Sequence, residues 1–230
     1  MNTISNIIVP NRLLLVWQPL EEHLSRTRRV VGELYRSAQG VGFRYLTDTE
    51  DFREAKKVGF ECFPAFPDLV VNYGDVLDVF ITRLPPRSRN DFGEYLLAHR
   101  LPRNIEIDDF TLLGYTEARV PGDGFSIIHP FDGAPAPCQF LSEIAGYRHY
   151  HQDNGTNLIG KTLTFEVEHT NPHDPDAIMV LAEGILIGYV NRIQKEVFHQ
   201  WLQHRNLRAV VERKNGRPGK PRVLMFVDVC

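Results

Sequence analysis

The sequence has few cysteines and no long apolar run, and each absence excludes a class of protein. Among its 230 residues the only cysteines are Cys62, Cys138 and Cys230, an odd number without a Cys-x-x-Cys spacing. This pattern argues against a disulfide framework and a structural zinc site, and fits a reducing cytoplasm best. No stretch approaches the about 20 apolar residues of a membrane-spanning helix, and no charged leader is present. We therefore expect a soluble, unprocessed, cytoplasmic protein.

Positive charge is not in excess either, since the formal net charge is −3 at pH 7. Any electrostatic preference for nucleic acid must therefore be local. A local excess occurs late in the sequence, where Glu212 is the only acid among Arg205, Arg208, Arg213, Lys214, Arg217, Lys220 and Arg222. Contact with DNA phosphates is one interpretation, and a solvated hairpin tip is the other. The residues expected at phosphates are Arg192, Arg213, Lys214, Arg217 and Lys220.

The length fits two domains of roughly 100 to 130 residues better than one. The proline-rich segment 131–137 is the expected linker, which places the domains at 1–130 and 138–230. In the first half, apolar β-type runs predict strands at 12–17, 29–35, 40–45 and 125–129. Helices are predicted at 75–83, after Asn90 or Asp91, and after Asp108 or Asp109. The first half is therefore expected to be a small α+β domain, with an irregular, aromatic-rich stretch at 46–73 that packs into its core.

The second half has the pattern of a β-structure. Strands are predicted at 139–146, 161–168, 177–181, 185–190, 207–212 and 223–229. A helix is expected from Asn191, with Gln194 as its capping partner, and Asn215-Gly216 predicts the turn of the last hairpin. Six short strands and one helix predict a small, partly open β-barrel, so the fold class expected for the chain is α+β.

The approach to the first hairpin, Asn171-Pro-His-Asp174, has unusual turn chemistry. Pro172 and Pro175 stiffen the chain, and Asn171 and Asp174 can hydrogen-bond to the backbone of their own turn. These bonds would hold the side chains between them where a ligand meets them. The alternative is that the two side chains only cap the turn.

The run Asn171-Pro-His-Asp-Pro-Asp-Ala-Ile178, a short glycine turn and a β run ending in Gly188-Tyr189 resemble the HIRAN family. The resemblance implies an OB-like barrel that binds single-stranded DNA or a DNA 3′ end. It places at the 3′ end Arg148, His149, Tyr150, His173, Asp174 and Tyr189. The family's stacking tyrosines are His149 and His173 here, and histidine has a smaller face that becomes cationic near neutrality. End binding is therefore expected to be weaker, pH dependent or lost.

Five stretches in the first half are similar to the N-terminal subdomain of HipA-type kinases. They are Val31-Gly-Glu-Leu-Tyr35, Gly42-Phe-Arg-Tyr45, Phe60 to Phe66, Phe80-x-x-x-Leu-Pro-Pro86 and Asp109-Phe-x-Leu-Leu-Gly114. The similarity covers roughly residues 30 to 130. Nothing resembles the kinase domain itself, so catalysis by that route is excluded.

Metal and nucleophile chemistry are poorly supported by the residue spacing. The residues that invite a metal interpretation are His149, His151, His169, His173, Asp153 and Asp174. His149 and His151 would share a face of a strand, but no further ligand lies at a recognisable spacing. The cysteines lie in apolar or linker surroundings or at the last position, which does not suit a nucleophile. We expect no cofactor, no metal and no enzymatic activity.

Two functions from different classes follow. The first is a non-enzymatic DNA-binding adaptor, whose C-terminal domain binds single-stranded DNA or 3′ ends and whose N-terminal domain binds a separate helicase or nuclease chain, in DNA repair or phage defence. The second is a regulatory subunit or antitoxin that controls a HipA-like kinase chain in trans. A metal-dependent nuclease is a distant third. The neighbouring genes would distinguish the first two.

Overall fold

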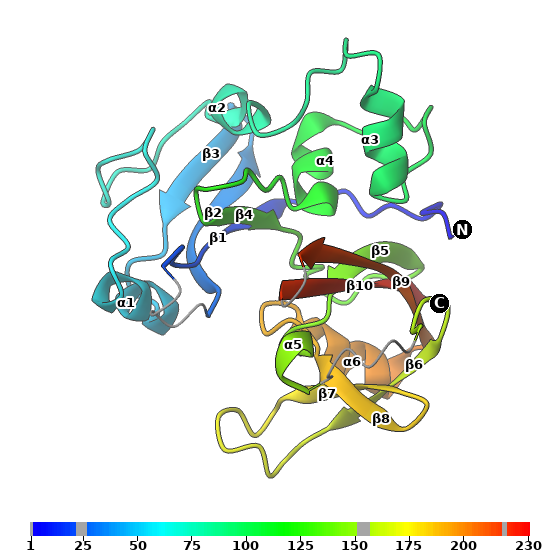
Figure 1. Cartoon of the computed structure of the whole chain (residues 1–230). Coiled ribbons are helices and arrows are strands. Elements are labelled where there is room, and N and C mark those ends of the chain that lie inside the picture. Colours follow the sequence, from blue (N-terminus) through cyan, green and yellow to red (C-terminus); the bar gives the residue numbers. More distant parts are fainter. Residues whose placement is uncertain (1, 22–26, 151–156, 218–219) are drawn as a thin grey trace. The chain divides into compact units, whose positions relative to one another are not determined.

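The computed structural model describes residues 2–21, 27–150, 157–217 and 220–230 (Figure 1). The chain divides into two compact units. The first, here the N-terminal unit, is Val9–His99 with Arg103–Pro130. The second, here the barrel unit, is Phe131–Cys230 with Met1–Ile8 and Arg100–Pro102. The barrel unit begins where the sequence becomes proline-rich, but it also includes two short segments from far earlier in the chain.

The N-terminal unit contains a four-stranded antiparallel sheet in the order β3-β2-β1-β4. Its strands are β1 (Arg12–Trp17), β2 (Arg29–Ser37), β3 (Gly40–Tyr45) and β4 (Phe125–Ile128). All four lie where the apolar runs predict them. Each carries fully or nearly fully buried aliphatic or aromatic side chains, such as Leu15, Leu34, Phe43 and Ile127, because one face of the sheet forms the core.

Four helices accompany this sheet: α1 (Glu50–Lys57), α2 (Leu77–Ile81), α3 (Phe92–Ala98) and α4 (Asp109–Thr116). Asp108 caps α4 by accepting from the Thr111 amide at 3.0 Å. Helix α1 lies in the stretch expected to be irregular. Its signals are local, since Thr49 caps it by accepting from the Phe52 amide at 3.2 Å, and acids begin it and lysines end it.

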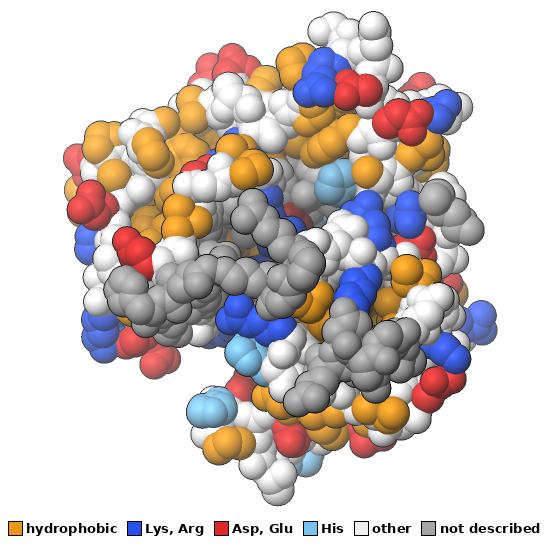
Figure 2. Space-filling model, viewed as in Figure 1, with side chains coloured by type: hydrophobic (Ala, Val, Ile, Leu, Met, Phe, Trp, Pro, Cys, Tyr) orange, Lys and Arg blue, Asp and Glu red, His pale blue; other side chains and the backbone are white. Residues whose placement is uncertain are grey.

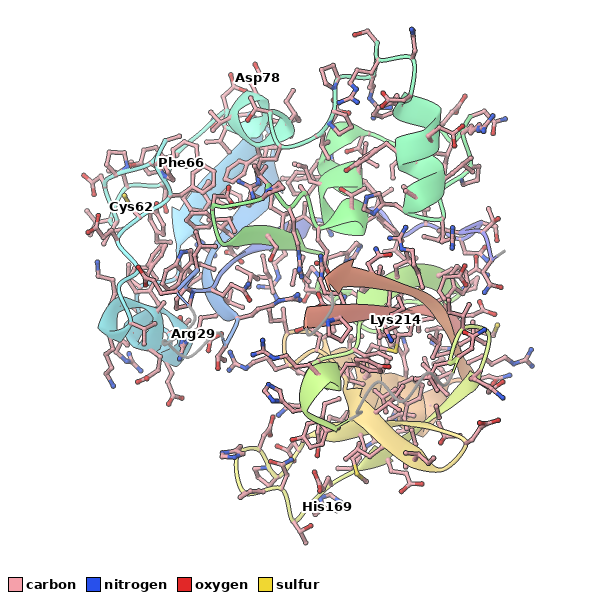
Figure 3. All side chains as sticks on the ribbon, viewed as in Figure 1. Arg29, Cys62, Phe66, Asp78, His169 and Lys214 are labelled. Carbon is pink, nitrogen blue, oxygen red and sulfur yellow. The ribbon has the colours of Figure 1, made fainter. Side chains whose placement is uncertain are left out.

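The aromatic residues after α1 pack into the core under their loop, as expected. Phe60, Phe63 and Phe66 are at most 7% exposed, and the Phe66 ring centroid lies 5.1 Å from that of Phe43 on β3. Figure 3 labels Phe66 beside β3. The Tyr45 hydroxyl joins the loop to the sheet by accepting from the Phe63 amide at 2.7 Å and donating to the Phe66 carbonyl at 2.6 Å.

The barrel unit contains a six-stranded antiparallel sheet in the order β5-β10-β9-β6-β7-β8. Its strands are β5 (Cys138–Glu143), β6 (Thr162–Val167), β7 (Ile178–Ala182), β8 (Ile185–Tyr189), β9 (Leu207–Arg217) and β10 (Lys220–Val229). The two edges meet at one point, where Ala145 and Tyr189 exchange backbone hydrogen bonds of 2.8 and 2.9 Å. The sheet is therefore a partly open barrel, and the α+β prediction is confirmed.

Two helices belong to this unit, not the one expected: the single turn α5 (Tyr147–Tyr150) and α6 (Lys195–His204). Helix α6 buries Val197, Phe198 and Trp201. The expected capping pair of α6 is wrong. Asn191 accepts from the Ile193 amide at 3.2 Å, whereas Gln194 accepts from the Ser142 hydroxyl at 2.9 Å, because burial against β5 gives Gln194 a better partner than the helix start.

The expected turn at Asn215-Gly216 is also wrong. Asn215 pairs with Arg222 and Gly216 with Pro221, so β9 and β10 continue past it. Gly216 has φ of 102°, a conformation that glycine adopts without strain, so this glycine serves the strand and not a turn. Residues 218–219 lie outside the described residues.

The first residues of the chain form a strap on the outer face of the barrel. The Ser5 amide and hydroxyl donate to Gln139 at 2.8 and 2.9 Å, and Ile4 is fully buried. The Ile4 amide donates to the Arg100 carbonyl at 2.7 Å, and Arg100 forms an ion pair with Glu212 at 2.5 Å. Residues 2–6 and Arg100 thus complete a surface that residues 131–230 alone would leave uncovered.

Candidate nucleic-acid interface

The turn before β7 is held by its own side chains. Asn171 Oδ1 accepts from the amides of His173 at 2.9 Å and Asp174 at 3.1 Å, and Asp174 Oδ1 accepts from the Asp176 amide at 3.1 Å. This is the turn chemistry expected from the sequence. It fixes the backbone at His173, whose side chain is exposed.

Asp174 has a partner that the sequence pattern did not reveal. Lys195 Nζ, at the start of α6, lies 2.6 and 2.7 Å from the two carboxylate oxygens. Partial burial acts to raise the pKa of Asp174, but the bonds from Lys195 and the Asp176 amide, with the charges of Lys195 and Arg192, outweigh it and lower the pKa. Asp174 is therefore a charged acceptor whose repulsion of phosphate is offset by a cation beside it.

Glu168 joins this turn to β8. Its Oε2 accepts from Asn171 Nδ2 and from the Tyr189 hydroxyl, both at 2.7 Å. These two bonds lower the pKa of Glu168. Burial and then the Glu168 carboxylate raise the pKa of Tyr189, so its hydroxyl remains a donor. Sequence reasoning missed Glu168, although a carboxylate three residues before Asn171 was a visible signal.

Helix α5 adds a second tyrosine. The rings of Tyr150 and Tyr189 meet edge to face with centroids 5.1 Å apart, and Tyr150 is 46% exposed. Gly188 lets the backbone before α5 lie close to β8, because a Cβ there would lie 2.4 Å from the Ala145 carbonyl oxygen. Arg148 and His149 are exposed on the same turn, and Arg148 Nε donates to His149 Nε2 at 3.0 Å.

The cations of β9 do not form one patch. Consecutive residues of a strand point to opposite faces of the sheet, and paired residues of neighbouring strands share a face. Lys214 pairs with the buried Val223 and faces inward, where its ammonium lies 5.9 Å from the centroid of the Tyr147 ring on α5. Arg213 pairs with Leu224 and faces outward. Burial and then the charges of Arg100 and Arg222 lower the pKa of Arg213.

Of the other expected phosphate contacts, Arg192 is exposed and close enough to Asp174 to lower its pKa. Arg217 and Lys220 pair with each other in the hairpin ladder, and their side chains lie outside the described part of the chain. Figure 2 shows Lys and Arg side chains at the surface over β10 and beside α5, and Figure 3 labels Lys214. The structure thus places Lys214 beside the buried Tyr147, and Arg213 near Arg100.

Lys214→Glu should weaken binding of single-stranded DNA of every sequence and reduce the salt slope by about 0.7 for one lost phosphate contact. Arg208→Glu, an exposed substitution earlier on β9, is the matched control and should leave the slope unchanged. Fluorescence anisotropy titrations at several salt concentrations measure both. Equal slopes for the two variants would assign Lys214 to a structural role beside Tyr147.

Within the described residues, no group of three or more His, Cys, Asp or Glu side chains is placed to hold a metal ion. His151 and Asp153, two members of the set that the sequence suggested, lie outside the described residues. No helix in the described ranges is long and apolar enough to cross a membrane.

Comparison with protein-family models and with curated proteins finds no match. Among solved structures, one match covers 40% of this chain and 74% of the other, at 15% identity and a TM-score of 0.32. Part of the chain is similar to the HIRAN domain of human HLTF. A Lactobacillus plantarum protein matches over 38% of this chain and 91% of its own length, at 18% identity and a TM-score of 0.30. The likeness to the N-terminal subdomain of HipA-type kinases stays a prediction.

Proposed function

We propose that the barrel unit binds single-stranded DNA or DNA 3′ ends, and that the chain is a non-enzymatic adaptor whose N-terminal unit binds a separate helicase, nuclease or HipA-like kinase chain. The observation that carries the DNA-binding part is the tyrosine pair Tyr150 and Tyr189, with the exposed Arg148 on the same helical turn as Tyr150. Aromatic faces beside cations are the usual means of binding single strands without reading their sequence.

The end-binding part of the proposal rests on the ion pair between Asp174 and Lys195. A lone carboxylate would repel DNA, whereas this pair offers a charged acceptor and a charged donor 2.6 Å apart. A terminal hydroxyl would donate to Asp174 while the ammonium contacts the phosphate of the same nucleotide. An internal nucleotide has no such hydroxyl, so the pair favours the terminus.

Tyr150→Ala should weaken binding of a single-stranded oligonucleotide by about 1 to 3 kcal/mol, because one base loses its stacking partner. Ile185→Ala removes a similarly exposed apolar side chain from the start of β8 and is the matched control. Anisotropy titrations at constant salt measure the difference. If both variants bind as the wild type does, DNA is not bound on these tyrosines and the DNA-binding part of the proposal fails.

A further inference from the structure

The outer edge of β3 in the N-terminal unit is only half covered. Val41 accepts from the Val76 amide at 2.9 Å, and Phe43 exchanges two backbone bonds of 2.8 Å with Tyr73. In an antiparallel strand, every second residue directs its backbone N–H and C=O toward the same edge. Because Val41 and Phe43 direct theirs toward the outer edge, the Tyr45 amide and carbonyl also face outward. Among the residues that the structure describes, none continues this pairing at Tyr45.

The segment that pairs with β3, residues 73–76, does not extend to Tyr45, and a cleft of about 350 Å³ lies there. Residues 44–49 line one side of this cleft and residues 69–72 line the other. The open position is held by hydrogen bonds. The Tyr73 hydroxyl accepts from the Asp68 amide at 2.9 Å and donates to its carbonyl at 3.0 Å.

The far wall of the cleft is apolar and accessible. Val70 is 87% exposed and Val71 is 41% exposed, which places two aliphatic side chains next to an unpaired strand edge. On the face drawn in Figure 2, hydrophobic side chains gather over the segment that Figure 1 colours cyan. Proteins usually protect a strand edge with charge, proline or a covering segment, and aliphatic side chains do the opposite.

Two exposed carboxylates lie at the cleft: Asp48 lines it, and Asp68 directly precedes the lining residue Leu69. In the described ranges neither carboxylate forms an ion pair. The one cation of the lining, Arg44, donates through Nε to Glu33 Oε1 at 2.7 Å, and Glu33 also pairs with Arg12 at 3.1 Å. An occupant with basic side chains at its ends would complement this rim.

We propose that this cleft binds an extended peptide of a partner protein, which adds to the edge of β3 at Tyr45. Aliphatic side chains of the peptide contact Val70 and Val71, and its Lys or Arg side chains face Asp48 and Asp68. Backbone bonds to Tyr45 supply the docking geometry, as in other cases of strand addition. The proposal rests on the partner-binding part of the proposed function and is independent of DNA binding.

The test uses the whole protein and three fluorescein-labelled, end-capped hexapeptides measured by anisotropy. The first is Lys-Val-Thr-Val-Thr-Lys, the second replaces both lysines with glutamate, and the third replaces the central valine with proline, which has no N–H to donate to Tyr45. The first should bind saturably with Kd below about 1 mM. The other two should bind about ten-fold more weakly or not at all.

Matched variants locate the site. Val70→Thr with Val71→Thr keeps the side-chain shape, removes the aliphatic wall, and should weaken binding of the basic peptide about ten-fold. Val120→Thr changes another exposed valine of the same unit and should have no effect. No saturable binding of the basic peptide, equal binding of all three peptides, or equal affinity of the two variants would each overturn the proposal. DNA binding, measured in parallel, should be unchanged by all of these substitutions, so a failure of the cleft and a failure of the DNA interface are distinguishable.

Discussion

Glu212→Ala should lower the free energy of unfolding of the barrel unit by about 3 to 5 kcal/mol, because it removes a counter-charge from the buried Arg100 guanidinium. The side chains of Arg100 and Glu212 are 10% and 7% exposed, and Asn2 donates to the second Glu212 oxygen at 2.6 Å. Urea denaturation measures the change. The fully buried Trp201 reports on the barrel in a Trp17→Phe background, which leaves one tryptophan in the chain.

Two further variants control this experiment. Glu183→Ala breaks the exposed ion pair with Lys161, whose side chains are 59% and 41% exposed, and should change the free energy of unfolding by less than about 1 kcal/mol. Arg100→Met combined with Glu212→Leu should recover much of the loss, since it removes both buried charges. A Glu212→Ala protein as stable as the wild type would show that the ion pair does not hold the strap.

A single-stranded oligonucleotide with a free 3′-hydroxyl should bind more tightly than the same oligonucleotide with a 3′-phosphate, by roughly 1.5 to 3 kcal/mol. In the proposed end binding, the Asp174 carboxylate would accept from the hydroxyl, and it would repel the phosphate dianion to the extent that Lys195 does not offset its charge. Asp174→Ala should narrow the preference, and Asp176→Ala, which removes a neighbouring exposed carboxylate, should not. Competition anisotropy measures, for each variant, the ratio of the affinities for the two oligonucleotides. Equal affinity for the two oligonucleotides, unaffected by Asp174→Ala, would contradict end recognition.

The preference for a 3′-hydroxyl should also respond to substitution of Lys195 and to pH. Lys195→Met should widen the preference for the hydroxyl, because it removes the ammonium that would attract a terminal phosphate. The bonded environment of Asp174 lowers its pKa, so the charged form persists below the usual range of an aspartate, about 3.9. The preference should therefore persist through neutral pH, weaken near a pH of about 6, where the terminal phosphate dianion gains a proton, and be lost only as the pH falls through that lowered pKa.

The strands of both units could be predicted from the sequence because their signals are local. Runs such as Arg12–Trp17 and Ile185–Tyr189 combine β-branched or aliphatic residues with turn residues at their ends. The first agrees with the predicted bounds and the second ends one residue before the predicted Val190. The turn chemistry of Asn171 and Asp174 is equally local, because each side chain bonds an amide two or three residues ahead.

What the sequence did not reveal depends on distant partners. Lys195 is 21 residues from Asp174, and Tyr189 is 21 residues from Glu168. These contacts form because β8 and the start of α6 fold back against the turn at residues 171–174. No rule of sequence spacing predicts such a contact. The turn predicted at Asn215-Gly216 is wrong for the opposite reason. Its local sequence signal is strong, but pairing between the long strands β9 and β10 continues past it. The sequence could not show that Arg213 and Lys214 lie on opposite faces of the sheet, because that depends on the register between β9 and β10.

The strap has a consequence for the order of folding during synthesis. Ser5 bonds Gln139 across 134 residues and Asn2 bonds Glu212 across 210, so residues 2–5 must wait for partners that are synthesised much later. The N-terminal unit has all its segments once Pro130 is made, whereas the barrel unit needs segments from both sides of the N-terminal unit. Until Gln139 and Glu212 have been made, Ser5 and Asn2 lack these partners. Long-range pairing of this kind is slow, so the N-terminal unit should fold first on the nascent chain and the barrel should close only after β9 and β10 have emerged.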